Sequence, residues 1–325
     1  MAKPGGSVLV AALTAALVAL ALDGSAPAGG GGWASLTPSP IERTEVGAGR
    51  IGDRIYVVGG FVAPGVSTGR MTRYDISDGT WREVEPLPIG VNHPGVTAHR
   101  GHLYVLGGFT DTSGATSRFY RYAAGRDRWR RLPDAPTSRG ALGFVGIGGH
   151  LYAAGGTTGQ TGEFRGLEIY DIDERRWSQG PPMPTGRNHV GATVFKRGVV
   201  VIGGRTNAGT NLGVVERYYR GRDSGRRRWG ELPDLEVPRS GHAAVSVDGM
   251  PVVFGGEQLS EGTNTIPEAE AFDPRQREWV PLPPMPTPRH GLGGVAAGRR
   301  AFAADGGPQP GYSFSNALEA LRVTP

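Results

Sequence analysis

Residues 102–132, HLYVLGGFTDTSGATSRFYRYAAGRDRWRRL, decide the fold of this chain. An apolar run leads into a glycine pair that begins at Gly107, and Tyr122 and Trp129 follow. The run before the glycines has the short apolar pattern of a β-strand, and two further strand patterns come after it. A glycine pair lets two backbones approach closely at the end of a strand. The stretch therefore predicts a small antiparallel sheet with aromatic side chains packed on it.

The same pattern recurs six times along the chain. The glycine pairs begin at residues 59, 107, 155, 203, 255 and 306, in steps of 48, 48, 48, 52 and 51 residues. A repeat of this length that contains several short strands is typical of the blades of a β-propeller. Five copies continue with the aromatic residues Tyr74, Tyr122, Tyr170, Tyr218 and Phe272 and the tryptophans Trp81, Trp129, Trp177, Trp229 and Trp279.

The sixth copy, which begins at Gly306, has no tryptophan after its glycine pair. A tryptophan at the other end of the sequence, Trp33, precedes Gly59 by 26 residues, which is the spacing from tryptophan to glycine pair in the regular copies. We therefore expect residues 33–39 to supply the outer strand of the last blade and residues 290–323 to supply the rest of it. Pairing the two ends of the chain in this way would remove the open edge of the sheet.

These glycine pairs, aromatic residues and tryptophans resemble the repeats of the kelch family over residues 29–325. The resemblance implies an all-β, six-bladed β-propeller with four-stranded antiparallel blades. In this fold the segment before each inner strand and the loop after each glycine pair open on the same face. Exposed loops on a rigid scaffold are the usual place for function, so we expect a ligand to bind at that face.

The N-terminal residues predict export. Lys3 precedes an apolar run at residues 8–22, and residues 26–28, Ala-Pro-Ala, form a cleavage pattern. The run is 15 residues long, shorter than the roughly 20 residues that a membrane-spanning helix needs. We therefore expect residues 1–28 to be a signal peptide and residues 29–325 to be a single propeller. The mature protein would then be secreted or periplasmic, with no membrane span. The alternative is that the apolar run is an uncleaved membrane anchor.

The composition excludes several kinds of site. The chain contains no cysteine, so disulfides, thiolate metal ligands and cysteine nucleophiles are impossible. Its net charge is +5, from 35 Lys and Arg and 30 Asp and Glu, and the basic residues are spread along the chain. This spread does not favour a nucleic-acid partner. We expect a monomer that uses no metal and no other cofactor.

The segments before the inner strands carry a recurring basic position. They read PIERTEVG, PIGVNHPG, PTSRGALG, PTGRNHVG, EVPRSGHA and PTPRHGLG. Guanidinium groups bind carboxylates and phosphates through paired hydrogen bonds, so five arginines around one mouth predict a pocket for an anionic ligand. The alternative is a structural contact that most blades need. The candidate ligand-binding residues of these segments are Arg43, Asn92, His93, Arg139, Arg187, His189, Arg239, His242, Arg289 and His290.

Two further candidates directly follow glycine pairs. Arg205 and Glu257 occupy equivalent positions in neighbouring copies, which would bring a cation and a carboxylate to the same face. Such a pair can perform acid–base catalysis, and it can equally be an ion pair of little consequence. Arg205 and Glu257 are therefore both ligand-binding candidates and the only candidates for catalysis.

The kelch resemblance implies two classes of function, of which we favour the first. In that class the protein is an interaction module that recognises a protein or a glycan, including an acidic one, at the loop face. The alternative is a carbohydrate-active enzyme, because the exported six-bladed architecture is similar to that of N-acetylneuraminate epimerase, a sugar mutarotase. Galactose oxidase is similar in repeat type, but its cofactor needs a tyrosine linked to a cysteine, which this chain lacks.

Overall fold

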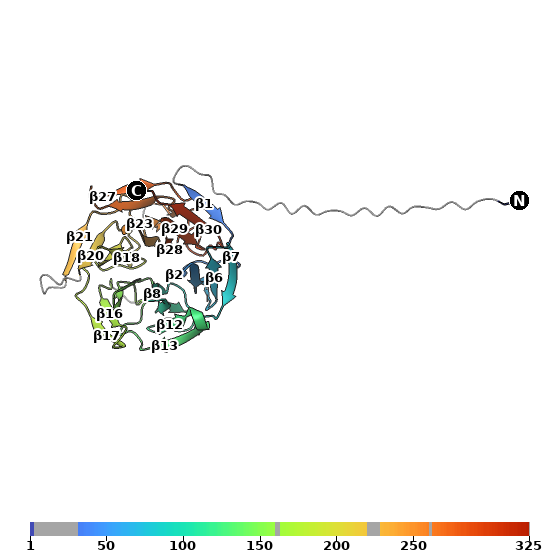
Figure 1. The fold of residues 1–325 in the computed structure, drawn as a ribbon. Coiled ribbons are helices and arrows are strands. Elements are labelled where there is room, and N and C mark those ends of the chain that lie inside the picture. Colours follow the sequence, from blue (N-terminus) through green and yellow to red (C-terminus); the bar gives the residue numbers. More distant parts are fainter. Residues whose placement is uncertain (3–31, 160–162, 220–227, 260–261, 325) are drawn as a thin grey trace. The chain divides into compact units, whose positions relative to one another are not determined.

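The computed structural model of the protein describes residues 1–2, 32–159, 163–219, 228–259 and 262–324. Six four-stranded antiparallel sheets surround a common axis as the blades of a propeller (Figure 1), which confirms the predicted fold. The predicted signal peptide lies outside the described residues except for residues 1–2. Among the described residues the single helical element is a short 3-10 turn, η1 (Ala124–Arg126), and none of their helices is long and apolar enough to cross a membrane.

The strands of blades 1 to 5 run in chain order from the axis outward. Blade 1 consists of β2 (Gly47–Ile51), β3 (Arg54–Val58), β6 (Met71–Asp75) and β7 (Thr80–Val84). Blade 2 consists of β8 (Gly95–His99), β9 (His102–Leu106), β12 (Phe119–Ala123) and β13 (Arg128–Leu132). Blade 3 consists of β14 (Gly143–Ile147), β15 (His150–Ala154), β16 (Leu167–Asp171) and β17 (Arg176–Gln179). Blade 4 consists of β18 (Gly191–Phe195), β19 (Gly198–Ile202), β20 (Val215–Tyr219) and β21 (Arg228–Leu232), and blade 5 of β22 (Ala243–Val247), β23 (Met250–Phe254), β26 (Ala269–Asp273) and β27 (Glu278–Leu282).

Blade 6 joins the two ends of the chain, as the sequence predicts. It consists of β28 (Gly293–Ala297), β29 (Arg300–Ala304), β30 (Leu318–Arg322) and, on the outside, β1 (Trp33–Leu36). In the antiparallel register Trp33 lies opposite Leu321, and Leu36 lies opposite Leu318. The Trp33 ring also meets Phe254 of blade 5 edge-on, with 5.6 Å between centroids. The N-terminal strand therefore covers the edge of β30 and ties blade 6 to its neighbour.

The recurring tryptophans connect each blade to the one before it. The indole nitrogen Nε1 of Trp129 donates a hydrogen bond of 2.9 Å to the carbonyl of Glu85, which follows the outer strand of blade 1. All six tryptophans make this contact, at 2.8–2.9 Å. A buried indole usually finds such a partner, so each tryptophan combines apolar packing with one directed bond between blades.

The glycine pairs are required by the same close approach between blades. Gly155 and Gly156 have φ of 62° and 97°, which favour glycine. A Cβ on Gly155 would lie 2.7 Å from the carbonyl oxygen of Arg187, to which the Gly156 N–H donates a bond of 3.0 Å. A side chain at Gly155 would therefore push the next blade away.

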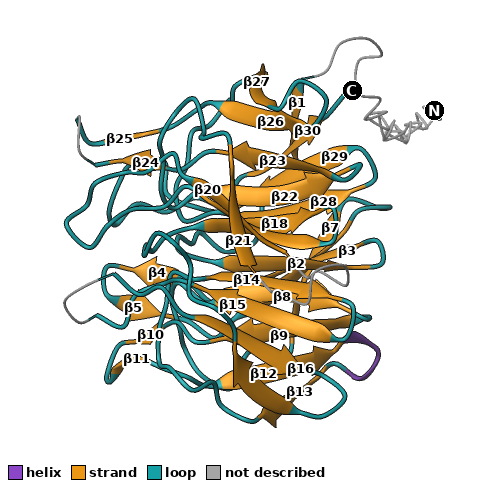
Figure 2. Cartoon of the chain, turned by 90° about the vertical axis from the view of Figure 1, so that its left-hand side faces the viewer, coloured by secondary structure: helices purple, strands orange, loops and turns teal. Residues whose placement is uncertain are grey.

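Three small hairpins mark one face of the ring. They are β4 (Phe61–Ala63) with β5 (Val66–Ser67), β10 (Phe109–Thr110) with β11 (Gly114–Ala115), and β24 (Glu257–Gln258) with β25 (Asn264–Thr265). Figure 2 shows them together on one side of the blades. This side, called the loop face below, is where the sequence places the candidate residues.

Candidate functional site

The five arginines of the recurring position lie inside the blades. Each is at most 1% exposed and forms an ion pair with a buried carboxylate. This corrects the expectation of an arginine-lined funnel, because a guanidinium that is sealed in the interior and paired there cannot face a ligand. The pairs are Arg43 with Asp305 (2.8 Å), Arg139 with Glu168 (2.6 Å), Arg187 with Glu216 (2.6 Å), Arg239 with Glu270 (2.5 Å) and Arg289 with Glu319 (2.9 Å).

Four of these carboxylates belong to a second recurring position that the sequence reasoning missed. Each is the glutamate two residues before the aromatic position of the third strand, as Glu216 is before Tyr218. Blade 2 has neither member of the pair, because Val91 and Tyr120 occupy the two positions, both buried. The joint absence of arginine and glutamate from one copy is the signal that could have revealed the pairing.

The residue two positions after the recurring arginine forms a closed ring at the axis, called the axial ring below. All six members have a left-handed backbone with φ between 50° and 61°. Each member after the first donates its N–H to the carbonyl of the member in the preceding blade, and Val46 N–H closes the circle on Gly291. The members are Glu45, His93, Ala141, His189, Gly241 and Gly291.

Three members of the axial ring carry large polar side chains at an energetic cost. A left-handed conformation costs a residue with a Cβ roughly 1–2 kcal/mol, whereas glycine adopts it freely. The ring accepts Gly241, Gly291 and Ala141, so nothing in its backbone calls for a large side chain. Strained positions of this kind gather at functional sites. Of the three, Glu45 was missed from the sequence, although PIERTEVG and PTGRNHVG place it in the same column as His189.

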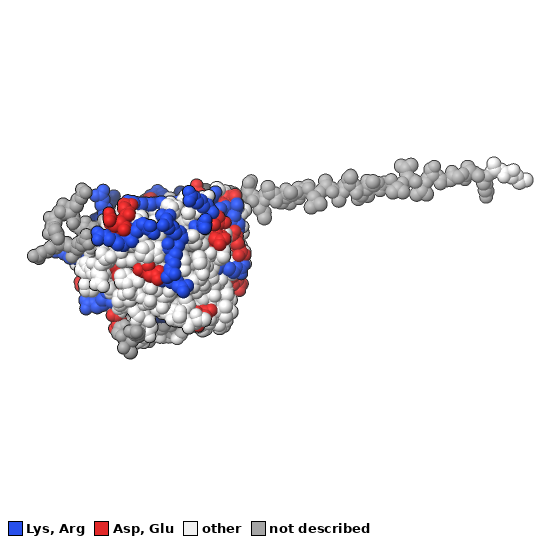
Figure 3. Space-filling view, turned by 90° about the horizontal axis from the view of Figure 1, so that it is seen from below, with Lys and Arg blue, Asp and Glu red and all other residues white. Residues whose placement is uncertain are grey.

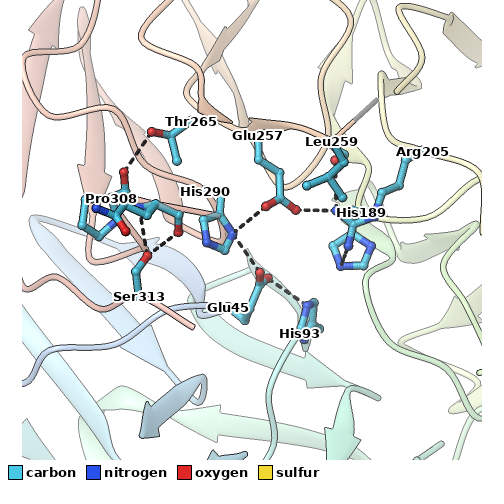
Figure 4. Close-up of polar contacts among 12 residues, drawn as sticks. Glu45, His93, His189, Arg205, Glu257, Leu259, Thr265, His290, Pro308 and Ser313 are labelled. Atoms are coloured by element: carbon cyan, nitrogen blue, oxygen red, sulfur yellow. Dashed lines mark hydrogen bonds and ion pairs between the residues drawn. The ribbon is translucent and has the colours of Figure 1, made fainter. Parts of the chain in front are cut away.

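The side chains of Glu45, His93 and His189 meet three side chains from outside the ring. The six residues are called the mouth cluster below: Glu45, His93, His189, Arg205, Glu257 and His290. Figure 4 shows them converging from five blades. Glu45 is central: one carboxylate oxygen lies 3.0 Å from His93 Nε2 and the other 3.1 Å from His290 Nδ1. His290 Nδ1 also lies 3.5 Å from Glu257 Oε2.

Arg205 connects the other half of the cluster. Its guanidinium forms an ion pair with Glu257, and Nη2 lies 2.9 Å from His189 Nε2. The sequence therefore correctly placed Arg205 and Glu257 together at the mouth. The Arg205 side chain is 17% exposed and that of Glu257 is 4% exposed, so the pair is more buried than a surface ion pair.

Two asparagines orient the imidazoles of the axial ring. Nδ1 of His93 lies 2.5 Å from Asn92 Oδ1, and Nδ1 of His189 lies 2.6 Å from Asn188 Oδ1. An amide oxygen only accepts, so each Nδ1 carries a proton and donates it, which leaves Nε2 to face the cluster. The predicted site residue Asn92 is thus a positioning residue, and its counterpart Asn188 was missed although the Asn-His dipeptide repeats.

The charges of the cluster are set by burial and by its own neighbours. Burial alone would raise the pKa of Glu45, but His93 and His290 outweigh it and hold that pKa well below its usual value. Burial and then the Arg205 charge lower the pKa of His189 well below its usual value, which keeps this ring neutral. Burial opposes a charge on His290, but Glu45 and Glu257 outweigh it and raise its pKa. An ionised carboxylate, a neutral imidazole and an imidazole biased toward its charged form therefore lie side by side.

The axis next to the ring holds a cavity whose lining residues carry mostly small or apolar side chains. It has a volume of about 120 Å³ and is lined by residues of the inner strands and of the segments just before them, in all six blades. Most are glycine, alanine, valine or leucine, and His242 has the one polar side chain among the described residues of this lining. His242 is buried, and both of its ring nitrogens are without a hydrogen-bond partner. This candidate therefore belongs to the cavity wall rather than to the mouth cluster.

Replacing His242 with leucine is expected to reduce the loss of stability in acid. Burial and then the nearby Arg239 charge lower the pKa of His242 to about 3, against about 6.5 in an unfolded chain. The unfolded state therefore binds one more proton between these values, and stability falls by up to about 1.4 kcal/mol per unit as the pH drops from 6.5 toward 3. Urea unfolding of both proteins at pH 4, 5, 6 and 7 measures this slope. Leucine is native at the equivalent positions Leu142 and Leu292, and equal slopes for the two proteins would contradict the assignment.

Comparison with known proteins places the chain in a family. A family model described as the KLHDC2/KLHL20/DRC7 Kelch-repeats domain matches residues 46–217, more than half of the chain, and a Kelch motif model matches residues 238–286. The chain belongs to the kelch-repeat family. The resemblance that the glycine pairs and tryptophans suggested is thereby confirmed.

Curated relatives of this kelch protein match over short stretches. An F-box/kelch-repeat protein of Arabidopsis thaliana is 32% identical over 83 residues, which are 26% of this chain and 21% of the relative. Beta-scruin of Limulus polyphemus is 29% identical over 132 residues, which are 39% of this chain and 14% of the relative. The matches therefore span only about a fifth or less of these relatives.

A solved structure shares the propeller nearly in full. The structure of YjhT superimposes with a TM-score of 0.76, covering 87% of this chain and 95% of that one. The sequence identity is 14%, so this likeness shows the fold alone.

Proposed function

We propose that this kelch protein is an exported interaction module that binds a glycan at its loop face, with the mouth cluster in contact with the ligand. The observation that carries the proposal is the placement of Glu45, His93 and His189 at left-handed positions that the ring fills elsewhere with glycine or alanine. Export rests on the pattern of residues 1–28. A sugar carries many hydroxyl groups, and the cluster offers carboxylate acceptors, imidazoles and a guanidinium donor within a few ångströms.

Aromatic side chains beside the cluster support a sugar as the ligand. Phe61 and Phe109 each meet His93 edge-on, with centroids 6.0 Å and 5.7 Å away. Tyr312 meets Phe61 at 5.2 Å and is 57% exposed, although it is a large aromatic residue. Apolar surface with a few convergent polar groups is the usual composition of a small-ligand site. An aromatic ring at the rim offers a flat face to the C–H groups of a sugar.

The charge distribution favours a neutral glycan over an acidic one. The five arginines that suggested an anionic ligand form ion pairs with carboxylates inside the blades, and Arg205 is paired with Glu257. On the side of the protein shown in Figure 3, Lys and Arg lie in a band with Asp and Glu among them rather than in a patch of one sign. Such mixing also supports the expectation that nucleic acid is not the partner.

A glycan microarray tests the proposal. The variants Glu257→Gln and Tyr312→Ala are expected to lower the affinity for the bound glycan at least about 10-fold, since each removes a directed contact worth roughly 1–2 kcal/mol. The melting temperature of Tyr312→Ala should not change, because its side chain is exposed. Arg299→Ala is the matched control, since Arg299 is half exposed and pairs with Asp248 in turns between first and second strands, away from the loop face. An array without any bound glycan, or variants that bind as the unmodified protein does, would overturn the proposal.

One observation favours a second candidate, a sugar mutarotase. Glu45 and His93, and Glu257 and His290, are carboxylate–imidazole pairs at 3.0 and 3.5 Å. Anomer exchange needs one proton removed from the anomeric hydroxyl and one delivered to the ring oxygen, and paired groups of this kind can supply both. Exchange measured by NMR with N-acetylneuraminate and other reducing sugars separates the candidates. A rate of anomer exchange no higher than in buffer would exclude the mutarotase function. Glycan binding without any acceleration of exchange would support the interaction module.

A further inference from the structure

We infer that Glu45, His93 and His189 form a binding site for one divalent transition-metal cation, which departs from the expectation of a metal-free protein and goes beyond the proposed function. A carboxylate oxygen of Glu45 and one ring nitrogen from each histidine lie within 4.8 Å of one another. Two imidazoles and one carboxylate form the ligand set of many catalytic zinc sites and of non-haem iron(II) sites. Three protein ligands leave coordination positions open toward the mouth.

The two histidines are held in the form that a metal requires. The Nδ1–H of each ring is directed to an asparagine oxygen, Asn92 for His93 and Asn188 for His189. A hydrogen bond of this kind on the second ring nitrogen is found on nearly all metal-binding histidines, where it fixes the tautomer and the ring plane. The Nε2 atoms of both rings thus lie on the side of Glu45, where His93 Nε2 donates to the carboxylate and His189 Nε2 accepts from Arg205. A cation would replace the His93 proton and the Arg205 contact.

One of the three distances is already short enough for a shared cation, and all three ligand atoms lie within 4.8 Å of one another. Nε2 of His93 is already 3.0 Å from Glu45 Oε2, and the planes of the two imidazoles cross at 83° with centroids 4.8 Å apart. Ligand atoms at about 2.0–2.2 Å from zinc in a tetrahedral site lie roughly 3.4 Å from one another. The backbone beneath the three residues is the hydrogen-bonded axial ring, so their backbone positions are fixed and only the side chains need to move to bring the ligand atoms together.

Arg205 competes with the cation. Its Nη2 lies 2.9 Å from His189 Nε2, the lone pair that the metal would use. Arg205 does not depend on that contact, because it also pairs with Glu257 and donates to Ser240 Oγ at 3.3 Å. A bound cation would therefore displace one hydrogen bond and leave the Arg205–Glu257 pair in place.

Cobalt(II) titration of the untagged protein, after treatment with EDTA and dialysis, tests the site. One Co²⁺ per chain is expected, detected by its visible d–d absorption and displaced by Zn²⁺. His189→Ala should abolish binding, and it should fold because Ala141 has the same backbone conformation at the equivalent position. Asn188→Ala, which removes only the orienting oxygen, should weaken binding about 10- to 100-fold. Arg205→Met should tighten it.

The matched control uses histidines outside the site. His99 and His102 lie at the turn between β8 and β9, away from the loop face, where they bind the carbonyls of Gly148 and Arg100. The double variant His99→Ala/His102→Ala should bind one Co²⁺ as the unmodified protein does. No bound Co²⁺, binding unchanged in His189→Ala, or binding lost in the control would each overturn the inference. Glycan binding measured in EDTA shows separately whether the proposed function stands without the metal.

Discussion

Replacement of Arg187 with alanine is expected to lower the free energy of unfolding by about 3–5 kcal/mol, because it leaves a buried carboxylate without its partner. Arg187 is fully buried and bonds to Glu216 at 2.6 Å. It also donates to the carbonyls of Thr185, Val201 and Gly203 at 2.8–3.0 Å, so the truncation leaves several acceptors unsatisfied as well. Urea unfolding followed by tryptophan fluorescence at pH 7 measures the loss.

Blade 2 supplies the matched control for this substitution. Its Val91 and Tyr120 show which apolar pair the fold accepts at the two positions. The double variant Arg187→Val/Glu216→Tyr copies them into blade 4 and should recover most of the lost stability, since well-packed apolar residues often replace a buried ion pair at little cost. An Arg187→Ala protein as stable as the unmodified one, or a double variant as unstable as the single one, would contradict the structural role of the arginines.

Removal of β1 is expected to destabilise the whole propeller by about 3–5 kcal/mol, because it removes a whole strand together with the partly buried Trp33, which packs against the core of blades 5 and 6. A chain that begins at Pro38 lacks Trp33, whose indole donates to Pro283 O at 2.8 Å, and Thr37, whose carbonyl accepts from Trp81 at 2.8 Å. It also exposes the whole edge of β30, and exposed edges pair with other chains. Thermal unfolding and size-exclusion chromatography record both effects.

A chain that begins at Gly32 is the control for this truncation, because it keeps every pair between β1 and β30. It should unfold as the longer chain does. If the chain from Pro38 has the same melting temperature as the chain from Gly32 and stays monomeric, the pairing of β1 with β30 does not stabilise the propeller.

The fold could be predicted from the sequence because each blade repeats the residues that its contacts with the neighbouring blades require. The glycine pair is needed where blades approach, and the tryptophan is needed where a blade bonds to the one before it, so both recur with the blade. The closure could be predicted for the same reason: Trp33 keeps the repeat spacing to Gly59, and only a ring brings it beside Leu321.

The site could be predicted only in part. The Arg205–Glu257 pair lies at the loop face, together with the segments before the inner strands, as the repeat predicts. The direction of the arginines was not predictable from the segment alone, because a side chain on a surface loop can turn outward or into the blade. The buried partner that decides it, such as Glu216, lies 29 residues further along the chain.

Position within the repeat separates the histidines that the sequence grouped together. His93 and His189 occupy the axial column. His242 is one residue later and lines the cavity on the axis, and His290 is one residue earlier and joins Glu45 to Glu257. Glu45 shares the axial column but is not a histidine, so a search for like residues passed over it.

The most direct test of the roles of the axial ring and of the buried arginines compares two variants, His189→Ala and Arg187→Ala. Glycan binding and the free energy of unfolding are measured for both. We propose that the axial ring serves binding and that the buried arginines serve stability. His189→Ala is then expected to lose glycan binding while its free energy of unfolding stays within about 1 kcal/mol of the unmodified value, as Ala141 in the same ring indicates. Normal glycan binding by His189→Ala, or a loss of binding without a loss of stability in Arg187→Ala, would contradict this division.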